Sequence, residues 1–178
     1  ELTCFTGYPN HGKTEFCLQL MAIKSKKEGT KFAIYSPENH PNYEIYNQLI
    51  HAYVGSSTEK HHINQMSEKQ YFDAIDFFHE SFFLIEPPKD RHNLDYVMAC
   101  VQHSMNKQNV EGFMIDPWHA LDHDDMLRDD KQVRAGLTKI LRFEQEHNLY
   151  ALLIAHPKMK LPKDDGSLPC PTMYDLAG

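Results

Sequence analysis

Hydrophobic residues follow two alternating patterns along this chain. Short apolar runs, such as residues 32–35, alternate with longer stretches in which apolar residues lie three or four positions apart, as do Leu94, Val97, Met98 and Val101. The first pattern is typical of buried strands and the second of amphipathic helices. Strands that alternate with helices form a mostly parallel sheet with helices on both faces. The sequence therefore predicts an α/β fold.

The predicted elements follow one another without a repeat or a low-complexity linker. We expect strands near residues 2–5 and at 32–35, 82–85, 113–115 and 151–155. The helices are predicted from apolar residues at helical spacing: Phe16, Leu20 and Ile23; Tyr46, Leu49, Ile50 and Tyr53; Tyr71, Phe72, Ile75 and Phe78; Leu94 to Met105; and Val133, Leu137, Ile140 and Leu141. We expect the aromatic residues of the second and third of these stripes to lie in the core.

The composition is that of one domain. A chain of 178 residues with 41% hydrophobic residues is long enough to bury about 70% of its unfolded surface. Its apolar stretches are shorter than the ~20 residues of a membrane span, and we expect an intracellular protein. The cysteines Cys4, Cys17, Cys100 and Cys170 are scattered and form no CxxC pair. We expect them to be reduced core thiols.

Charge and histidine content narrow the function classes. The formal net charge of −7 disfavours broad electrostatic binding to nucleic acid but allows a local basic loop. Adjacent histidines, such as His61 and His62, point in different directions and make poor metal sites. Residues 119–125 combine histidines with aspartates, but 122–130 is expected to be an acidic loop that caps the next helix through Asp129 or Asp130.

Residues 7–14 match the phosphate-binding pattern GxxxxGKT, and they lie between a predicted strand and a predicted helix. In that setting backbone N–H groups and the helix dipole converge on a polyphosphate. Gly7 and Gly12 allow the tight turn, Lys13 supplies charge, and Thr14 completes the coordination of Mg²⁺. We therefore expect ATP or another nucleoside triphosphate to bind here. The binding residues are predicted to be Gly7, Pro9, Asn10, His11, Gly12, Lys13 and Thr14.

Polar residues follow three of the predicted strands. Glu38 comes after the second strand, Asp116 ends the fourth, and His156 ends the fifth. Because ligands bind at the carboxyl ends of parallel strands, we expect these residues beside the P-loop. Asp116 is suited to hold Mg²⁺ through water, Glu38 to act as general base, and His156 to sense the γ-phosphate. Structural roles are the alternative. Asp116 and His156 would then be turn residues, and Glu38 would stabilise the N-terminus of the next helix.

Four motifs occur in one order: residues 7–16, Ser36-Pro37-Glu38-Asn39, Ile115-Asp116-Pro117-Trp118 and Ala155-His156-Pro157-Lys158. Together they resemble the RecA-like ATPase domain of hexameric replicative helicases. The resemblance is nearest to the Twinkle and phage primase-helicase branch, which is related to the DnaB family. It runs from the P-loop strand to residues 174–178, and so it implies that residues 1–178 form one RecA-like P-loop domain.

The resemblance implies a ring-shaped hexamer that hydrolyses nucleotide between subunits and unwinds DNA while moving along single-stranded DNA. Lys13, Glu38 and His156 would then be catalytic, and Thr14 and Asp116 would hold Mg²⁺. The loop after His156 would contact DNA phosphates, and lysines there would give salt-sensitive binding without sequence preference. Those lysines are Lys158, Lys160 and Lys163. Relatives occur in bacteria, phages and mitochondria; we expect the cytoplasm and leave the mitochondrion open.

Some features depart from the family pattern. His11 and His119 stand where the family usually has a small residue and an asparagine. The resemblance also implies that the sequence stops before the final strands and the arginine finger of the family, so this piece is expected to hydrolyse nucleotide poorly and to be monomeric. The arginines Arg91, Arg128, Arg134 and Arg142 are no obvious replacements.

Other functions stay open. A RecA-like ATPase for regulated assembly or strand exchange would show DNA-dependent hydrolysis without unwinding. A small-molecule phosphotransferase would need an acceptor pocket and an arginine-bearing lid, of which the sequence gives no sign. A nucleotide-binding module without turnover is disfavoured by Glu38 and Asp116 beside Lys13.

Overall fold

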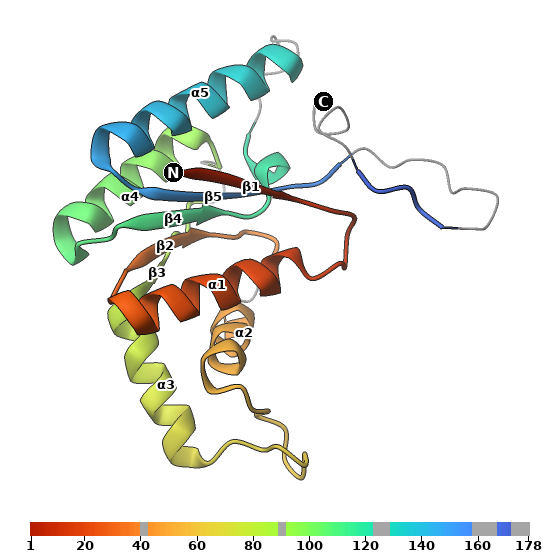
Figure 1. Ribbon diagram of the computed structural model, residues 1–178. Helices are drawn as coiled ribbons and strands as arrows, with labels where there is room; N and C mark the ends of the chain where they lie inside the picture. The colour runs from red at the N-terminus through yellow and green to blue at the C-terminus, as the bar shows by residue number, and fades with distance from the viewer. Residues whose placement is uncertain (40–42, 89–91, 123–128, 158–166, 172–178) are drawn as a thin grey trace.

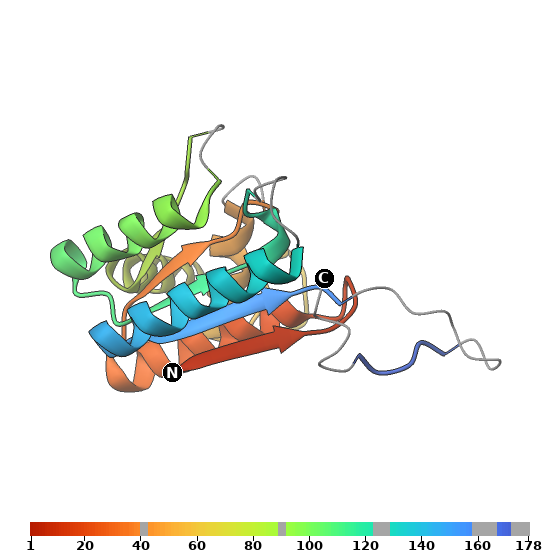
Figure 2. The same cartoon turned by 90° about the horizontal axis from the view of Figure 1, so that it is seen from above.

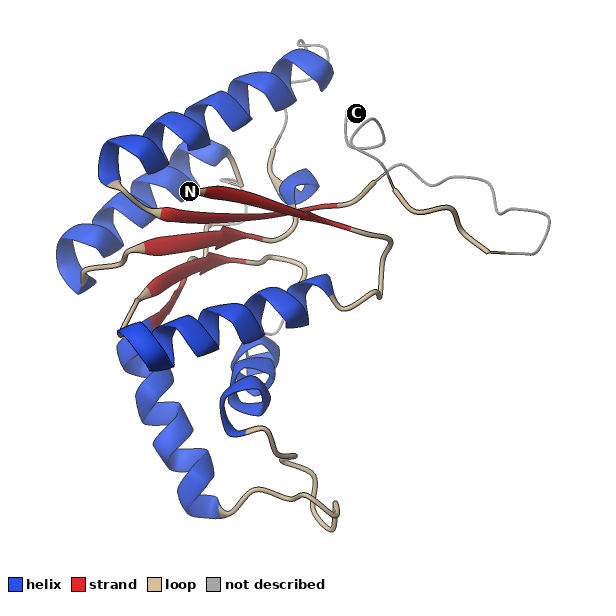
Figure 3. Cartoon of the chain, viewed as in Figure 1, coloured by secondary structure: helices blue, strands red, loops and turns tan. Residues whose placement is uncertain are grey.

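The computed structural model describes residues 1–39, 43–88, 92–122, 129–157 and 167–171. Within these residues, five strands form one sheet in which every neighbouring pair is parallel (Figure 3). Their order across the sheet is β1-β5-β4-β2-β3, so β1 and β3 are the edges. The strands are β1 (Leu2–Thr6), β2 (Phe32–Tyr35), β3 (Phe82–Leu84), β4 (Gly112–Ile115) and β5 (Tyr150–Ala155).

Helices cover both faces of this sheet, as Figures 1 and 2 show. One face carries α1 (Lys13–Glu28), α2 (Tyr43–Val54) and α3 (Glu68–Ser81), and the other carries α4 (Leu94–Gln108) and α5 (Asp129–His147). A short 3-10 helix, η1 (Trp118–Ala120), follows β4. The α/β class and the parallel sheet predicted from the sequence are confirmed.

Alternate residues of the central strands build two separate cores. Ile34, Met114 and Ile154 pack with the buried residues of α1, α2 and α3. Ala33 and Leu153, which come from the same sheet, pack instead with α4 and α5. All four residues of β2 and of β4 are buried. Burial on both faces explains why these strands are continuous apolar runs in the sequence.

The ends of α1 agree with its sequence signals. The helix begins after Gly12 and ends at Gly29, and both glycines have φ of 72°. This left-handed conformation favours glycine because it has no Cβ. The Gly29 N–H donates to the Ser25 carbonyl, and Lys26 and Lys27 lie in the last turn. Cations in the last turn and a left-handed glycine after it are typical of a helix C-terminus.

The buried side of α1 differs from the apolar stripe in its sequence. Phe16, Leu20 and Ile23 are 51%, 41% and 42% exposed, whereas Cys17 and Leu18 belong to the core. Among the described elements, α1 packs mainly against α2 and β5, and these partners cover only part of its circumference. The spacing therefore located the helix but did not identify the residues that face the sheet.

Two expectations about the core were wrong in part. Phe78 of α3 is buried as expected, but Phe72 of the same helix is 54% exposed. The four cysteines are free, yet only Cys17 is buried, and Cys4 and Cys170 are exposed. Among the described helices, none combines the length and apolarity that crossing a membrane requires.

Gly136 of α5 allows Trp118 of η1 to approach the helix backbone. A Cβ at position 136 would lie 2.3 Å from the Cη2 atom of Trp118. We expect Gly136→Ala to lower the free energy of unfolding by about 1 kcal/mol. Overpacking against Trp118 costs roughly 1–3 kcal/mol, and the higher helix propensity of alanine offsets only about 1 kcal/mol of this cost. Urea unfolding monitored by circular dichroism tests this.

The matched control is Asn106→Ala, at an exposed position of α4. It also gains helix propensity but makes no close contact, and so we expect slightly higher stability. If Gly136→Ala were as stable as this control, the Trp118 contact would not constrain position 136.

Candidate nucleotide-binding site

The P-loop joins the end of β1 to the start of α1 at the carboxyl edge of the sheet (Figure 1). Asn10 and Gly12 have φ of 62° and 72°, and these left-handed residues turn the chain sharply into the helix. Backbone N–H groups in the first turn of a helix have no acceptor within the helix and carry partial positive charge. The loop therefore has the backbone form of an anion-binding site.

The two glycines of the loop differ in what they require. Gly12 has the left-handed φ, whereas Gly7 does not, and a Cβ at Gly7 would make only ordinary contacts of 3.5 Å with the Lys13 side chain. The prediction that Gly12 forms the tight turn is confirmed. The conformation seen here places no such demand on Gly7.

Lys13 lies within the loop and bonds to its backbone. Its Nζ donates to the Tyr8 carbonyl at 2.8 Å. Burial lowers the pKa of the Lys13 ammonium, while the nearby Asp116 and Glu38 carboxylates raise it. The Lys13 ammonium is thus held against the P-loop backbone, with the Asp116 and Glu38 carboxylates close by.

Asp116 is the buried carboxylate of this site, with only 3% of its surface exposed. Its Oδ2 accepts hydrogen bonds from Thr14 Oγ1 at 2.7 Å and from Ser36 Oγ at 3.3 Å. Asn39 Nδ2 donates in turn to Ser36 Oγ at 2.8 Å. Burial raises the pKa of the Asp116 carboxyl, and the two hydroxyl donors and Lys13 lower it. These bonds tie the P-loop helix to the ends of β2 and β4.

Glu38, His119 and His156 form a second group at the same edge. Glu38 Oε1 lies 3.0 Å from His119 Nε2, and both side chains are about half exposed, at 52% and 53%. The His119 and His156 rings meet edge to face with centroids 4.9 Å apart. Burial lowers the pKa of His156, as do the charges of Lys13 and His119. These effects favour the neutral form of the His156 ring.

A cleft of about 590 Å³ holds these groups together. Its lining contains every predicted site residue of the described chain except Gly7. The lining residues are Pro9, Asn10, His11, Gly12, Lys13, Thr14, Glu15, Glu38, Asn39, Gln48, Asp116 and His156. Lys158, Lys160 and Lys163 lie outside the described residues.

Some residues of the site were not predicted from the sequence. Ser36 and Asn39 flank Glu38 in the Ser-Pro-Glu-Asn motif, and their polar side chains were the available signal. Gln48 reaches the cleft from α2, a helix whose sequence pattern indicated only core packing. His119 was noted as a departure from the family pattern and as part of a metal-binding stretch judged unfavourable, and it contacts Glu38 directly.

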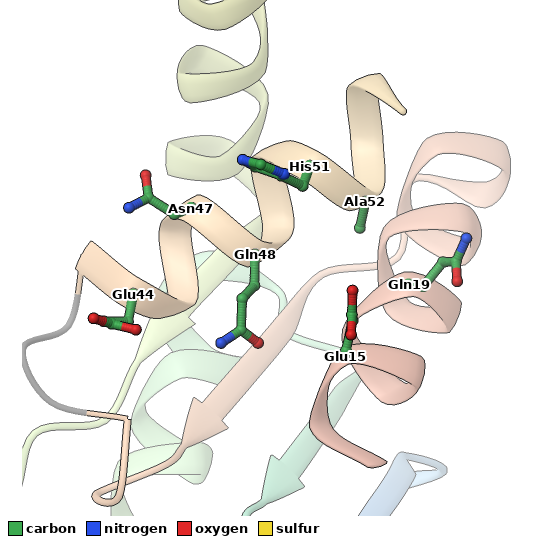
Figure 4. Close-up of a pocket in the computed structure, with 7 residues that line it drawn as sticks. All are labelled: Glu15, Gln19, Glu44, Asn47, Gln48, His51 and Ala52. Carbon is green, nitrogen blue, oxygen red and sulfur yellow. The ribbon is translucent and has the colours of Figure 1, made fainter. Parts of the chain in front are cut away.

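A polar groove of about 340 Å³ lies beside the cleft, between α1 and α2 (Figure 4). Glu15 and Gln48 line both the groove and the cleft. The remaining lining residues are Gln19, Glu44, Asn47, His51 and Ala52. The cleft therefore opens toward a surface that carries carboxylate, amide and imidazole groups.

The raised pKa of Asp116 predicts a pH-dependent stability of the nucleotide-free chain. The folded state holds the proton of this group to a higher pH than the unfolded state does. Ionisation therefore costs the folded state free energy as pH rises from about 4 through the folded-state pKa. We expect wild type to lose stability relative to Asp116→Asn as pH rises above about 4.

Urea unfolding at several pH values measures this difference, with Asp73→Asn as the control at an exposed position of α3. A constant difference between wild type and Asp116→Asn across the pH range would show that burial does not disfavour the charged carboxylate.

Comparison with known proteins identifies relatives of this architecture. In sequence, the chain is 28% identical to the Twinkle homolog protein, chloroplastic/mitochondrial, of Arabidopsis thaliana, over 100% of this chain and 26% of that protein. The chain thus spans about a quarter of the length of this curated relative. No family model matches the chain.

Solved structures share the fold. One of them, described as an ATPase domain, superposes with a TM-score of 0.76 at 16% identity, over 98% of this chain and 63% of that one. A DnaB-like replicative helicase, whose structure was described with its primase interactions, gives 0.75 at 16% identity, over 98% of this chain and 43% of that one. The resemblance to the RecA-like ATPase domain of DnaB-like replicative helicases, which the motifs indicated, is therefore confirmed in fold, and the Twinkle homologue supports it in sequence along the whole chain.

Proposed function

We propose that this chain is the motor domain of a replicative DNA helicase, which hydrolyses a nucleoside triphosphate to move along single-stranded DNA and unwind duplex. The observation that carries the proposal is the cleft in which the P-loop, Asp116, Glu38 and His156 meet. Triphosphate hydrolysis needs a phosphate cradle, a metal-supporting carboxylate, a group that activates water and a sensor of the γ-phosphate. The cleft contains one candidate for each role.

Phosphate binding is assigned to residues 9–14. The first turn of α1 offers backbone N–H groups and the positive end of the helix dipole. Lys13 now donates to the Tyr8 carbonyl, and a phosphate oxygen is a stronger acceptor for an ammonium than a neutral carbonyl. We infer that Lys13 exchanges the carbonyl for phosphate when nucleotide binds.

Thr14 and Asp116 are the residues that would hold Mg²⁺. Their oxygens lie 2.7 Å apart in a hydrogen bond, and oxygen ligands are what this ion prefers. Burial raises the pKa of the Asp116 carboxyl, and a bound cation would favour its charged form. Bound Mg²⁺ would neutralise charge on the phosphates.

Glu38 is assigned as the general base and His156 as the γ-phosphate sensor. The Glu38 side chain is half exposed, and so water can reach it. The neutral form of the His156 ring is favoured, in part by the Lys13 charge, and this form can donate a hydrogen bond to a phosphate oxygen without repelling Lys13. His119 contacts Glu38 and His156 and thereby links the two roles.

The proposed activity of the complete protein also involves a hexamer and DNA-binding residues outside the cleft. We propose a hexamer that binds single-stranded DNA through Lys158, Lys160 and Lys163, following the family resemblance; these lysines lie outside the described residues. The curated relative is named for chloroplasts and mitochondria, and for this protein a mitochondrial location stays open beside the cytoplasmic one. The alternative is a RecA-like ATPase that drives assembly or strand exchange without unwinding. The DNA-stimulation and unwinding assays described below distinguish this alternative from a helicase.

Lys13→Ala is expected to weaken nucleotide binding by at least about 100-fold, because the main positive charge for the phosphates is lost. Titration of a fluorescent ATP analogue measures the dissociation constant. Lys27→Ala removes an exposed lysine from the last turn of the same helix and should bind as wild type does. Tight binding by Lys13→Ala would contradict the phosphate assignment.

Glu38→Gln is expected to retain nucleotide binding and to lower steady-state hydrolysis by about 100-fold or more, since a general base contributes roughly that much. The assay uses the full-length protein with and without single-stranded DNA, beside Glu80→Gln at an exposed position of α3. DNA stimulation that is lost only in Glu38→Gln supports a translocating motor and leads to an unwinding assay. Hydrolysis indifferent to DNA would refute the helicase assignment.

A further inference from the structure

Three potential metal ligands converge at the carboxyl edge of the sheet, and two of them, Glu38 and His156, also line the cleft. They are Glu38 after β2, His119 in η1 after β4, and His156 after β5. One ligand atom from each lies within 4.8 Å of the other two. The three residues are far apart in sequence, and their meeting follows from the order of the parallel strands, in which β5, β4 and β2 are neighbours.

The donor set differs in kind from the proposed Mg²⁺ site. Mg²⁺ prefers oxygen ligands, and Thr14 and Asp116 offer only oxygens. Two imidazoles with one carboxylate suit a divalent transition metal such as Zn²⁺, which binds three protein ligands and keeps a fourth position for water. The oxygen-only pair and the nitrogen-rich triad thus offer different donor sets at the same edge of the sheet.

The geometry of the triad is close to what such an ion needs. With bonds of about 2.0–2.1 Å, tetrahedral ligand atoms lie about 3.4 Å apart. Glu38 Oε1 and His119 Nε2 are already 3.0 Å apart, and both side chains are about half exposed and free to adjust. The His156 Nδ1 atom is buried and makes no hydrogen bond to the described residues. One imidazole nitrogen of His156 therefore has no hydrogen-bond partner among the described residues.

We propose that Glu38, His119 and His156 form a binding site for a divalent transition metal, with Zn²⁺ as the representative ion. A bound ion takes the carboxylate oxygen of Glu38 as a ligand. If the proposed function is correct, this occupancy withdraws Glu38 from activating water, and Zn²⁺ inhibits hydrolysis while leaving the P-loop accessible. His119 is the residue that distinguishes this site, because it brings a nitrogen donor to Glu38.

The test is the zinc affinity of the nucleotide-free, full-length protein, measured by competition with a chromophoric zinc chelator. We expect His119→Asn to weaken the tightest zinc site at least about tenfold, because the asparagine amide is a poor zinc ligand. Asparagine remains able to donate a hydrogen bond to Glu38, and the fold is checked by thermal unfolding. His103→Asn, at an exposed position of α4, controls for weak binding by surface histidines and should match wild type.

The outcomes are distinct. Equal zinc affinity in wild type and His119→Asn would overturn the proposal. So would a Co²⁺ complex with a thiolate charge-transfer band, because that would place the metal on exposed cysteines such as Cys4 or Cys170. If His119→Asn fails to fold, Glu38→Gln, altered at a half-exposed side chain, supplies the same comparison.

The affinity is measured without nucleotide, so it stands independently of the ATPase assignment. A zinc site lost in His119→Asn, in a protein that hydrolyses no nucleotide, would support the metal site and refute the proposed function. Hydrolysis by wild type that Zn²⁺ does not inhibit, despite tight binding to these residues, would refute the inhibitory consequence alone.

Discussion

The buried carboxylate of Asp116 is the constraint around which this edge of the molecule is organised. A charge or polar group removed from water must be hydrogen-bonded, or the fold loses several kcal/mol. Thr14 and Ser36 supply those bonds, and the Asp116 backbone N–H donates to the Tyr35 carbonyl at 2.9 Å. The first turn of α1 and the ends of β2 and β4 are thereby held in one arrangement. The phosphate loop keeps its place because the helix it starts is tied to this carboxylate.

The sheet confines the chemistry to its edge. Strands β2 and β4 are buried along their full length by apolar side chains on both faces. A functional polar group inside these strands would be desolvated without a partner, so the polar side chains begin where the strands end. Because all strand pairs are parallel, the ends that carry Glu38, Asp116 and His156 lie at the same edge. The order of the strands across the sheet therefore determines how close these three side chains lie to one another.

The charged side chains of this edge pair with one another or with neighbouring polar groups. Lys13 bonds to the Tyr8 carbonyl, Glu38 contacts His119, and Asp116 accepts two hydroxyl hydrogen bonds. These contacts leave each of the three charged groups with a polar partner. Bound phosphate, Mg²⁺ or a transition metal would have to replace the partner of Lys13, Asp116 or Glu38, respectively. His119 has a particular position in this balance, because a histidine can pair with a carboxylate and also bind a transition metal. An asparagine at this place would keep the first property and lose the second.

Local pattern determined much of this protein. The alternation of strands and helices, the end of α1 at Gly29 and the P-loop before Lys13 depend on short-range physics: backbone conformation, capping and the burial of strands on both faces. The tertiary structure decided which faces are buried, as the exposure of Phe16 and Phe72 shows, because coverage depends on what packs against each helix. It also decided that His119 meets Glu38 and that Ser36 supports Asp116. Those contacts join residues distant in sequence, and their distances follow only from the order and register of the strands.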